Sequence, residues 1–300
     1  MKKIIRAALG ILSLAIAAGA YTDRASSAAF GFDIPVAEAT GKAAQKNKKA
    51  EIDYSNAKDG YVMAKYLQKT GKKVMVVIKG PKGSSYTYTL KPDGNYEVFP
   101  FSDGNGSYSV GVFEQIDGTK YATANTATVK VSLSDQFAPF IRPNQYVNYN
   151  KNSQAVKKAA SLIGSAADVT GMISAVYNYV IGNISYDKEL AQNVKSGYLP
   201  DVDAVLSRGK GICFDYSAVM TAMLRSLGIP CRLVVGYAGE VYHAWISVFS
   251  KETGLVNQVI HFDGANWTLM DPTFASTANQ SAEIMKYIGN GNNYSPKYLY

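Results

Sequence analysis

The sequence is poor in the residues that most often carry out chemistry. Among its 300 residues are only two cysteines, two histidines and two tryptophans. No stretch has metal-ligand spacing or a glycine-rich phosphate loop, so neither a metal nor a cofactor is expected. No arginine stripe or basic-aromatic interleaving occurs either, which argues against nucleic acid as a partner. Any histidine used as a base must be His243 or His261.

Long apolar runs are also missing. Beyond residue 20 no stretch reaches eighteen apolar residues, so no membrane span is expected after that point. Residues 1–20 instead combine an apolar core (Leu9 to Ala18), small residues at 18–20, and three basic residues in front, Lys2, Lys3 and Arg6. This pattern predicts a secretory signal peptide. No cysteine follows the core, so a lipid anchor has no attachment point. We expect a bacterial secreted protein, extracellular or associated with the cell wall.

Composition limits the size and class of the protein but not its function. With 47% hydrophobic and 18% charged residues, the chain is typical of globular proteins and long enough for two domains. Three of the positive charges behind the net charge of +8 lie in the signal segment. The remaining excess would weakly favour anionic cell-wall polymers or acidic surface proteins. Solvated surface lysines explain it more simply.

Changes of periodicity divide the rest of the chain. Residues 21–50 lack periodicity and are expected to be a linker. Residues 51–133 show apolar and polar alternation with hairpin turn signals, which predicts six or seven strands of an antiparallel β-sandwich, immunoglobulin-like in size. Its many tyrosines could form a ligand face, although half-buried strands favour tyrosine anyway. Residues 134–150, with two prolines, form a connector, and residues 151–300 form the second domain.

The second domain is organised around a predicted helix that begins at Cys213. Six apolar residues recur at helical spacing: Tyr216, Val219, Met220, Met223, Leu224 and Leu227. Gly228 and Pro230 should end this helix. A cysteine at a helix N-terminus lies beside unpaired N–H groups, which favour a thiolate and could stabilise an oxyanion. The sequence therefore places a candidate nucleophile at Cys213.

A base and an orienting carboxylate follow further along the chain. Alternation over residues 241–249 predicts a strand with His243 and Trp245 on one face. His261 lies on the next run, before a turn signal at Asp263, and a third strand ends at Asp271. Adjacent antiparallel strands would bring Asp271 beside one of the two histidines, where it could fix the tautomer.

From Gly209 to Phe274 the motifs G-x-C, L-G-I-P-C-R-L-V-x-G-Y, H-A-W and W-x-L-M-D-P resemble the transglutaminase-like superfamily of papain-like thiol enzymes. The resemblance implies an α+β papain-like cysteine protease core with an antiparallel sheet. It implies Cys213 as the nucleophile, His243 as the general base and Asp271 as the orienting residue. Tyr186 lies in a stretch that often precedes the active site in this family, so its hydroxyl is a candidate for the cleft or the oxyanion site, with Trp245 of H-A-W beside it.

Simpler interpretations remain for several residues. Cys231 starts an apolar run and is expected to be buried, although pairing with Cys213 would be possible in a secreted chain. His261 and Asp263 are interpreted as structural, the latter as a turn residue. Asp215 should help the helix N-terminus as a first-turn carboxylate. A packing role is the simpler interpretation of Tyr186.

The function expected from the sequence is an acyl-thioester reaction on peptide-type amides of a peptide or protein substrate. Resolution by water would make the protein a peptidase or amidase, which we favour for an exported protein. Resolution by an amine would make it a cross-linking transglutaminase. No acidic loop resembles a calcium site, so calcium dependence is not expected. A non-catalytic envelope-binding module on the same fold is the other alternative, and an adhesin role for the β-sandwich is a third.

Overall fold

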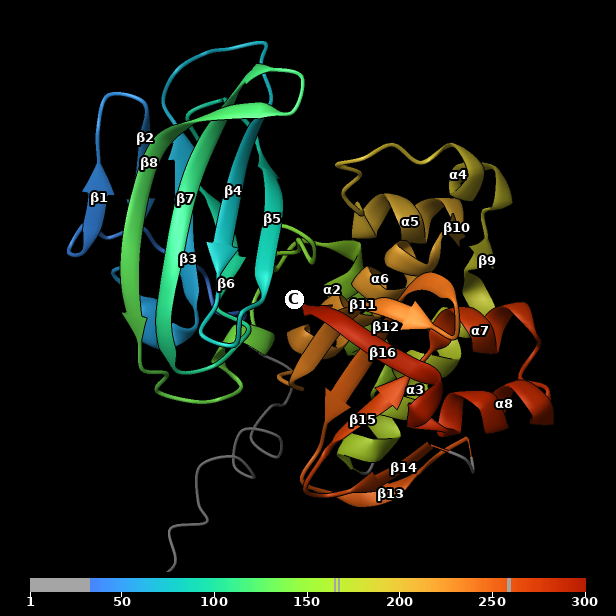
Figure 1. The fold of residues 1–300 in the computed structure, drawn as a ribbon. Helices are drawn as coiled ribbons and strands as arrows, with labels where there is room; N and C mark the ends of the chain where they lie inside the picture. Colours follow the sequence, from blue (N-terminus) through green and yellow to red (C-terminus); the bar gives the residue numbers. More distant parts are fainter. Residues whose placement is uncertain (1–32, 165, 167, 258–259) are drawn as a thin grey trace, which may run out of the picture. The chain divides into compact units, whose positions relative to one another are not determined.

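A computed structural model describes residues 33–164, 166, 168–257 and 260–300, which form one compact unit (Figure 1). The predicted signal peptide lies outside the described residues, as does the first part of the expected linker. No helix in the described chain is both long enough and apolar enough to cross a membrane. An all-β part comes first in the chain, and a part built of helices and antiparallel strands follows it.

The all-β part consists of two four-stranded antiparallel sheets, ordered β1-β2-β3-β6 and β5-β4-β7-β8. Their strands are β1 (Ala44–Lys46), β2 (Ala50–Asp53), β3 (Tyr61–Tyr66), β4 (Val74–Lys79), β5 (Ser85–Leu90), β6 (Glu97–Pro100), β7 (Gly106–Asp117) and β8 (Lys120–Val131). The predicted alternation is present, because Tyr86, Tyr88 and Leu90 of β5 are buried between neighbours that are exposed or half-buried. Immunoglobulin-like identity stays a prediction.

The expected linker is shorter than predicted. Strand β1 begins at Ala44 and pairs with β2, so the sheet starts inside the 21–50 stretch. The three residues of β1 carry no alternation of their own. Backbone pairing to β2, together with the bond from Gly41 N to the Asp53 carboxylate (2.7 Å), holds this edge in place. Sequence periodicity cannot detect an edge strand that buries so little apolar surface.

The second part has seven helices and eight strands among the described residues. The helices are α2 (Gln154–Leu162), α3 (Val169–Asn183), α4 (Lys188–Asn193), α5 (Val202–Arg208), α6 (Cys213–Ser226), α7 (Pro272–Thr277) and α8 (Ala282–Gly289). The strands are β9 (Ser185–Tyr186), β10 (Lys210–Gly211), β11 (Cys231–Ala238), β12 (Val241–Phe249), β13 (Thr253–Val256), β14 (Ile260–Asp263), β15 (Trp267–Met270) and β16 (Tyr294–Leu299). Helix α6 is the centre of this part, because it packs against β11, β12 and four other helices.

Four strands form an antiparallel sheet in the order β15-β12-β11-β16 (Figure 1). The sequence predicted both β12 and β15, but it also placed the strand that carries His261 in the same sheet, directly after β12. That strand, β14, pairs instead with β13 as a separate two-stranded ribbon. Because β15 pairs directly with β12, Asp271 follows the residue that lies opposite Ile246.

An aromatic cluster joins the two parts of the chain. Tyr88 of β5 lies edge-on to Tyr300, with ring centroids 5.8 Å apart, and Tyr146 of the connector lies 4.5 Å from Tyr300. Tyr146 also packs edge-on against Phe214, the residue after Cys213, at 5.2 Å. Aromatic pairs at these distances contribute beyond the area they bury. The β-sandwich is therefore packed directly onto the start of α6.

Arg225 ties the end of α6 to three other segments. Its side chain is 1% exposed, and it donates to the main-chain oxygens of Cys231 (2.8 Å), Arg142 (2.8 Å) and Tyr300 (2.6 Å). Burial lowers the pKa of this guanidinium, because the charged form loses its hydration. This one side chain therefore links the end of α6 to three segments of the chain.

Substituting Arg225→Met should lower the free energy of unfolding by about 3 kcal/mol, because three hydrogen bonds from the guanidinium to main-chain oxygens are lost, two of them buried, while the volume stays similar. Urea denaturation measures the change. Lys69→Met on the exposed sandwich surface is the control and should change it by no more than about 0.5 kcal/mol. Equal stability of the two variants would contradict the role given to Arg225.

Candidate active site

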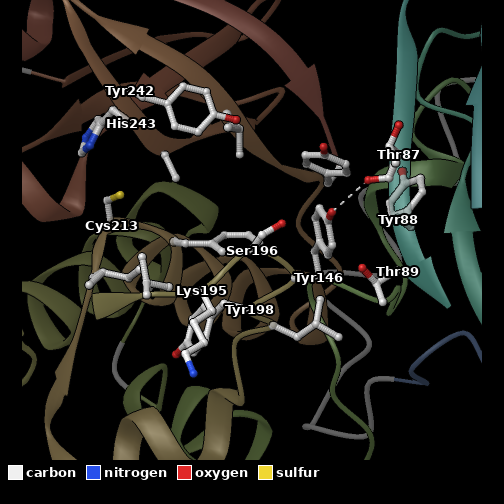
Figure 2. Close-up of a pocket in the computed structure, with 18 of the residues that line it drawn as sticks. Thr87, Tyr88, Thr89, Tyr146, Lys195, Ser196, Tyr198, Cys213, Tyr242 and His243 are labelled. Carbon is white, nitrogen blue, oxygen red and sulfur yellow. Dashed lines mark hydrogen bonds between the residues drawn. The ribbon is translucent and has the colours of Figure 1, made fainter. Parts of the chain in front are cut away.

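Cys213 is the first residue of α6, as the sequence predicted (Figure 2). It forms no disulfide, and it is half-buried. Asp215 fixes the helix start: its Oδ2 accepts from Ile212 N at 2.9 Å, and its Oδ1 accepts from the Tyr198 hydroxyl at 2.7 Å. Burial raises the pKa of this carboxyl. A side chain at Gly211 would lie 2.5 Å from Asp215 Cβ, so only glycine fits before the helix.

His243 and Asp271 lie in contact beside this helix. His243 Nε2 is 2.8 Å from Asp271 Oδ2, and the two side chains are 4% and 0% exposed. Strand pairing explains the contact, because β15 runs antiparallel beside β12 and delivers Asp271 at its end. The choice between the two histidines is thereby resolved. His261 lies exposed on β14 and does not bond to Asp271 among the described residues.

The imidazole is held so that its second nitrogen is left for the thiol. Phe274 stacks on the His243 ring, with centroids 4.4 Å apart. Burial lowers the pKa of His243, but hydrogen bonds with Asp271 and Cys213, and the charges of both groups, outweigh it and raise the pKa to about 9. With Nε2 bonded to Asp271, Nδ1 is the ring nitrogen available to Cys213. This arrangement stabilises the imidazolium.

Asp271 is bonded by four donors, of which the sequence indicated only a histidine. Its Oδ1 accepts from Thr273 N (3.1 Å) and Phe274 N (3.0 Å) at the start of α7, and its Oδ2 accepts from the Tyr294 hydroxyl at 2.9 Å. Tyr294 lies in the C-terminal stretch, to which the sequence motifs assign no role. The alternation of residues 294–300 could have indicated a strand, but nothing local connects Tyr294 to Asp271.

A cleft of about 610 Å³ leads to Cys213 (Figure 2). Tyr186 lines it, as predicted, together with Tyr242 and residues of the β-sandwich. Burial and the nearby Cys213 both raise the pKa of Tyr186. Trp245 does not line the cleft. It is 2% exposed and packs on Tyr294, a residue of β16 in the same sheet, with ring centroids 5.0 Å apart.

The second cysteine has the structural role expected for it. Cys231 is 0% exposed and unpaired, and burial raises its pKa to about 11. The alternative of a disulfide with Cys213 is therefore wrong for this structure. Asp263 accepts from Ala265 N and Asn266 N and is a turn residue, as predicted. In the described part of the chain, no three His, Cys, Asp or Glu side chains lie together as a metal site would require.

Residues 156–272 match the family model of the transglutaminase-like superfamily, and this part of the chain belongs to that superfamily. Its members are in general cysteine-based acyl-transfer enzymes. The match spans α2 to the start of α7 and includes Cys213, His243 and Asp271, whereas Tyr294 lies beyond it. No curated protein matches the chain.

Three solved structures are similar to this chain at low identity. A candidate cysteine protease from Cytophaga hutchinsonii is 15% identical, with 86% of this chain and 73% of that chain covered and a TM-score of 0.41. Red sea bream transglutaminase is 12% identical, with coverages of 73% and 49% and a TM-score of 0.35. LapG from Legionella pneumophila is 14% identical, with coverages of 47% and 91% and a TM-score of 0.28. This chain thus spans about half the length of the bream enzyme.

The raised pKa of His243 should make stability depend on pH. A histidine titrates near 6.5 when unfolded, and His243 titrates at about 9 when folded. Its contribution is therefore fully present below pH 6.5 and is lost as the pH rises through 9. The shift corresponds to about 3 kcal/mol of unfolding free energy. Urea unfolding at several pH values measures this contribution. The free energy of unfolding of the wild type should exceed that of His243→Gln below pH 6.5, and the difference should shrink as the pH rises through 9.

His261→Gln supplies the matched control, because His261 is exposed and contacts neither Cys213 nor Asp271 among the described residues. This variant should keep the pH-dependent advantage of the wild type. A stability difference between wild type and His243→Gln that is the same at pH 6 and pH 10 would contradict the geometry described for His243.

Proposed function

We propose that the protein is a secreted cysteine enzyme that forms an acyl-thioester with peptide-type amides and hydrolyses it. The observation that carries the proposal is that Cys213 and His243 line one cleft, with Asp271 buried and bonded to His243. Nucleophile, base and orienting carboxylate are the three roles that thiol acyl transfer needs. The superfamily match of residues 156–272 supports the same reaction class.

In the first step His243 takes the proton of the Cys213 thiol, and the resulting thiolate sulfur attacks the amide carbonyl carbon. The carbonyl oxygen becomes an oxyanion. The N-terminus of α6 supports its stabilisation, because helix N-termini present unpaired N–H groups and a positive dipole end. Tyr186 is a second candidate donor, since it lines the cleft close to Cys213.

In the second step the imidazolium of His243 gives its proton to the amide nitrogen. The carbon–nitrogen bond breaks, the amine leaves, and the acyl group remains on the Cys213 sulfur. Water then attacks the thioester while His243 takes a proton from it, and the carboxylic acid leaves as the thiol is restored. Asp271 keeps the ring in one tautomer and stabilises its positive charge throughout.

Two alternatives share this fold. A cross-linking transglutaminase would use the same acyl-thioester but resolve it with an amine of a second protein. A non-catalytic envelope-binding module would have an unreactive thiol or a blocked cleft. The cleft reaches a half-buried, unpaired Cys213, and this favours turnover over the binding module.

The proposal includes that the protein is exported and that its substrate is a peptide or protein at the cell surface. The basic start, apolar core and small residues of residues 1–20 support secretion. The excess of positive charge supports weak electrostatic attraction of the protein to anionic envelope polymers or acidic proteins.

The test is mass spectrometry of the protein quenched during incubation with a library of peptide amides. Cys213 should gain the mass of an acyl group as the matching amine is released, and the adduct should decay to free acid in water. Asp271→Asn keeps the size of the side chain but loses the carboxylate that orients His243, so acylation should slow roughly a hundredfold or more.

Cys213→Ser and His243→Ala control for adducts elsewhere, and Asp263→Asn is the matched control for a carboxylate outside the site. Added amine discriminates the two fates of the thioester. If an amide forms in place of the acid, the reaction is transamidation and the proposal of hydrolysis is wrong. No adduct with any peptide, together with a thiol that behaves as an ordinary one, would leave the binding module as the better account.

A further inference from the structure

The β-sandwich forms one wall of the cleft that reaches Cys213. Thr87 and Thr89, on β5, line the cleft opposite Cys213 and His243 (Figure 2). Lys73, just before β4, and Met75, on β4, line the same cleft. Strand β5 is at the edge of its sheet. Thr87 and Thr89 share one face of this strand, because side chains alternate along it. A substrate bound at the thiol therefore has sandwich residues within the same cavity.

This wall is fixed in position by contacts from both sides. The Tyr146 hydroxyl donates to the main-chain oxygen of Thr87 (Figure 2). Gln145 Nε2 donates to that of Thr89. The loop between α4 and α5 closes on the same strand, since a Cβ at Gly197 would lie 3.3 Å from Thr89 Oγ1. Tyr198 in turn bonds this loop to Asp215 of α6. The wall and the thiol helix thus form one framework.

Apart from the Cys213–His243 pair, the charged side chains that line the cleft are of one sign. Among the described residues that line it, none is Asp or Glu, whereas Lys73 comes from the sandwich and Lys195 from the loop across it. Apolar side chains also stay exposed at the cleft, Tyr242 at 58% and Val194 at 39%. A lining that is positive and partly apolar is complementary to an anionic chain with apolar groups.

We propose that the β-sandwich is half of the substrate site, and that it selects a peptide acyl donor carrying a carboxylate side chain away from the scissile amide. This inference rests on the proposed function, because it takes Cys213 as the acyl acceptor. Lys73 and Lys195 attract the carboxylate, and Thr87 lies on the wall against which the peptide packs. The sandwich thus contributes to substrate choice as well as to the stability of the thiol region.

The experiment measures how well peptides protect Cys213 from a neutral iodoacetamide probe. Three peptide amides of equal length carry Glu, Gln or Lys at one position, and that position is moved along the chain. At the best position the Glu peptide should give half-protection at a concentration about threefold lower than the Gln peptide, and the Lys peptide should be weakest. The preference should shrink as salt rises, because these lysines are exposed.

Substitutions locate the preference on the sandwich wall. Thr87→Glu places a carboxylate in the cleft and should reverse the order of the Glu and Lys peptides. Ser85→Glu is its matched control, because Ser85 is exposed on the same face of β5 but does not line the cleft. Lys73→Gln should weaken the Glu preference, as should Lys195→Gln, while Lys69→Gln should keep it.

The outcomes separate failure of this inference from failure of the proposed function. If Cys213 reacts as an activated thiol but the three peptides protect equally, the carboxylate preference is wrong and the enzyme remains. If Lys195→Gln removes the preference while Lys73→Gln and Thr87→Glu do not alter it, the sandwich is not part of the site. If Cys213 reacts with iodoacetamide as an ordinary thiol, the proposed function itself is contradicted, and this inference is contradicted with it.

Discussion

A buried carboxylate, Asp271, is the constraint on which the arrangement of the site depends. Its side chain is 0% exposed, and an ionised carboxylate without partners at such a position would cost several kcal/mol. Two N–H groups of α7, the Tyr294 hydroxyl and His243 satisfy its oxygens. Because these donors come from α7, β16 and β12, satisfying one side chain fixes the relative positions of three elements. His243 is oriented as a consequence.

The approach of β16 to the sheet depends on a second local feature. Gly236 lies opposite His243 in the pairing of β11 with β12, and a Cβ at Gly236 would lie 2.2 Å from the Ser295 oxygen. Only glycine allows β16 to reach this position beside β11. Tyr294 is thereby brought to Asp271, and its hydroxyl bond complements the one from His243. A segment outside the superfamily match thus completes the surroundings of the carboxylate.

Local periodicity was enough to predict much of this molecule. The helix starting at Cys213, the strand carrying His243 and Trp245, and the alternating strands of the sandwich all follow from patterns within ten to fifteen residues. What could not be predicted depends on contacts distant in sequence. Tyr294 and Asp271 are 23 residues apart, and β14 lies beside β13 rather than β12. Trp245 packs on Tyr294 of β16, a contact that no pattern in its own strand indicates.

The β-sandwich is connected to the thiol region by packed aromatic rings. Tyr88, Tyr300 and Tyr146 form a continuous aromatic path from β5 to Phe214, beside Cys213. Removing the sandwich would expose these rings to water and open the cleft on one side. An assay of the isolated second part would therefore examine a different surface from that of the full chain.

The central claim, that Cys213 and His243 form an activated pair, is tested most directly by the rate at which neutral iodoacetamide alkylates Cys213 between pH 4 and pH 10. Cys231 is buried and Cys213→Ser identifies any residual signal from it. In the wild type the thiol should react well below pH 8.5, the ordinary titration point of a free cysteine, and His243→Ala should lose that reactivity. A wild-type profile that follows an ordinary thiol and is unchanged by His243→Ala would contradict the account.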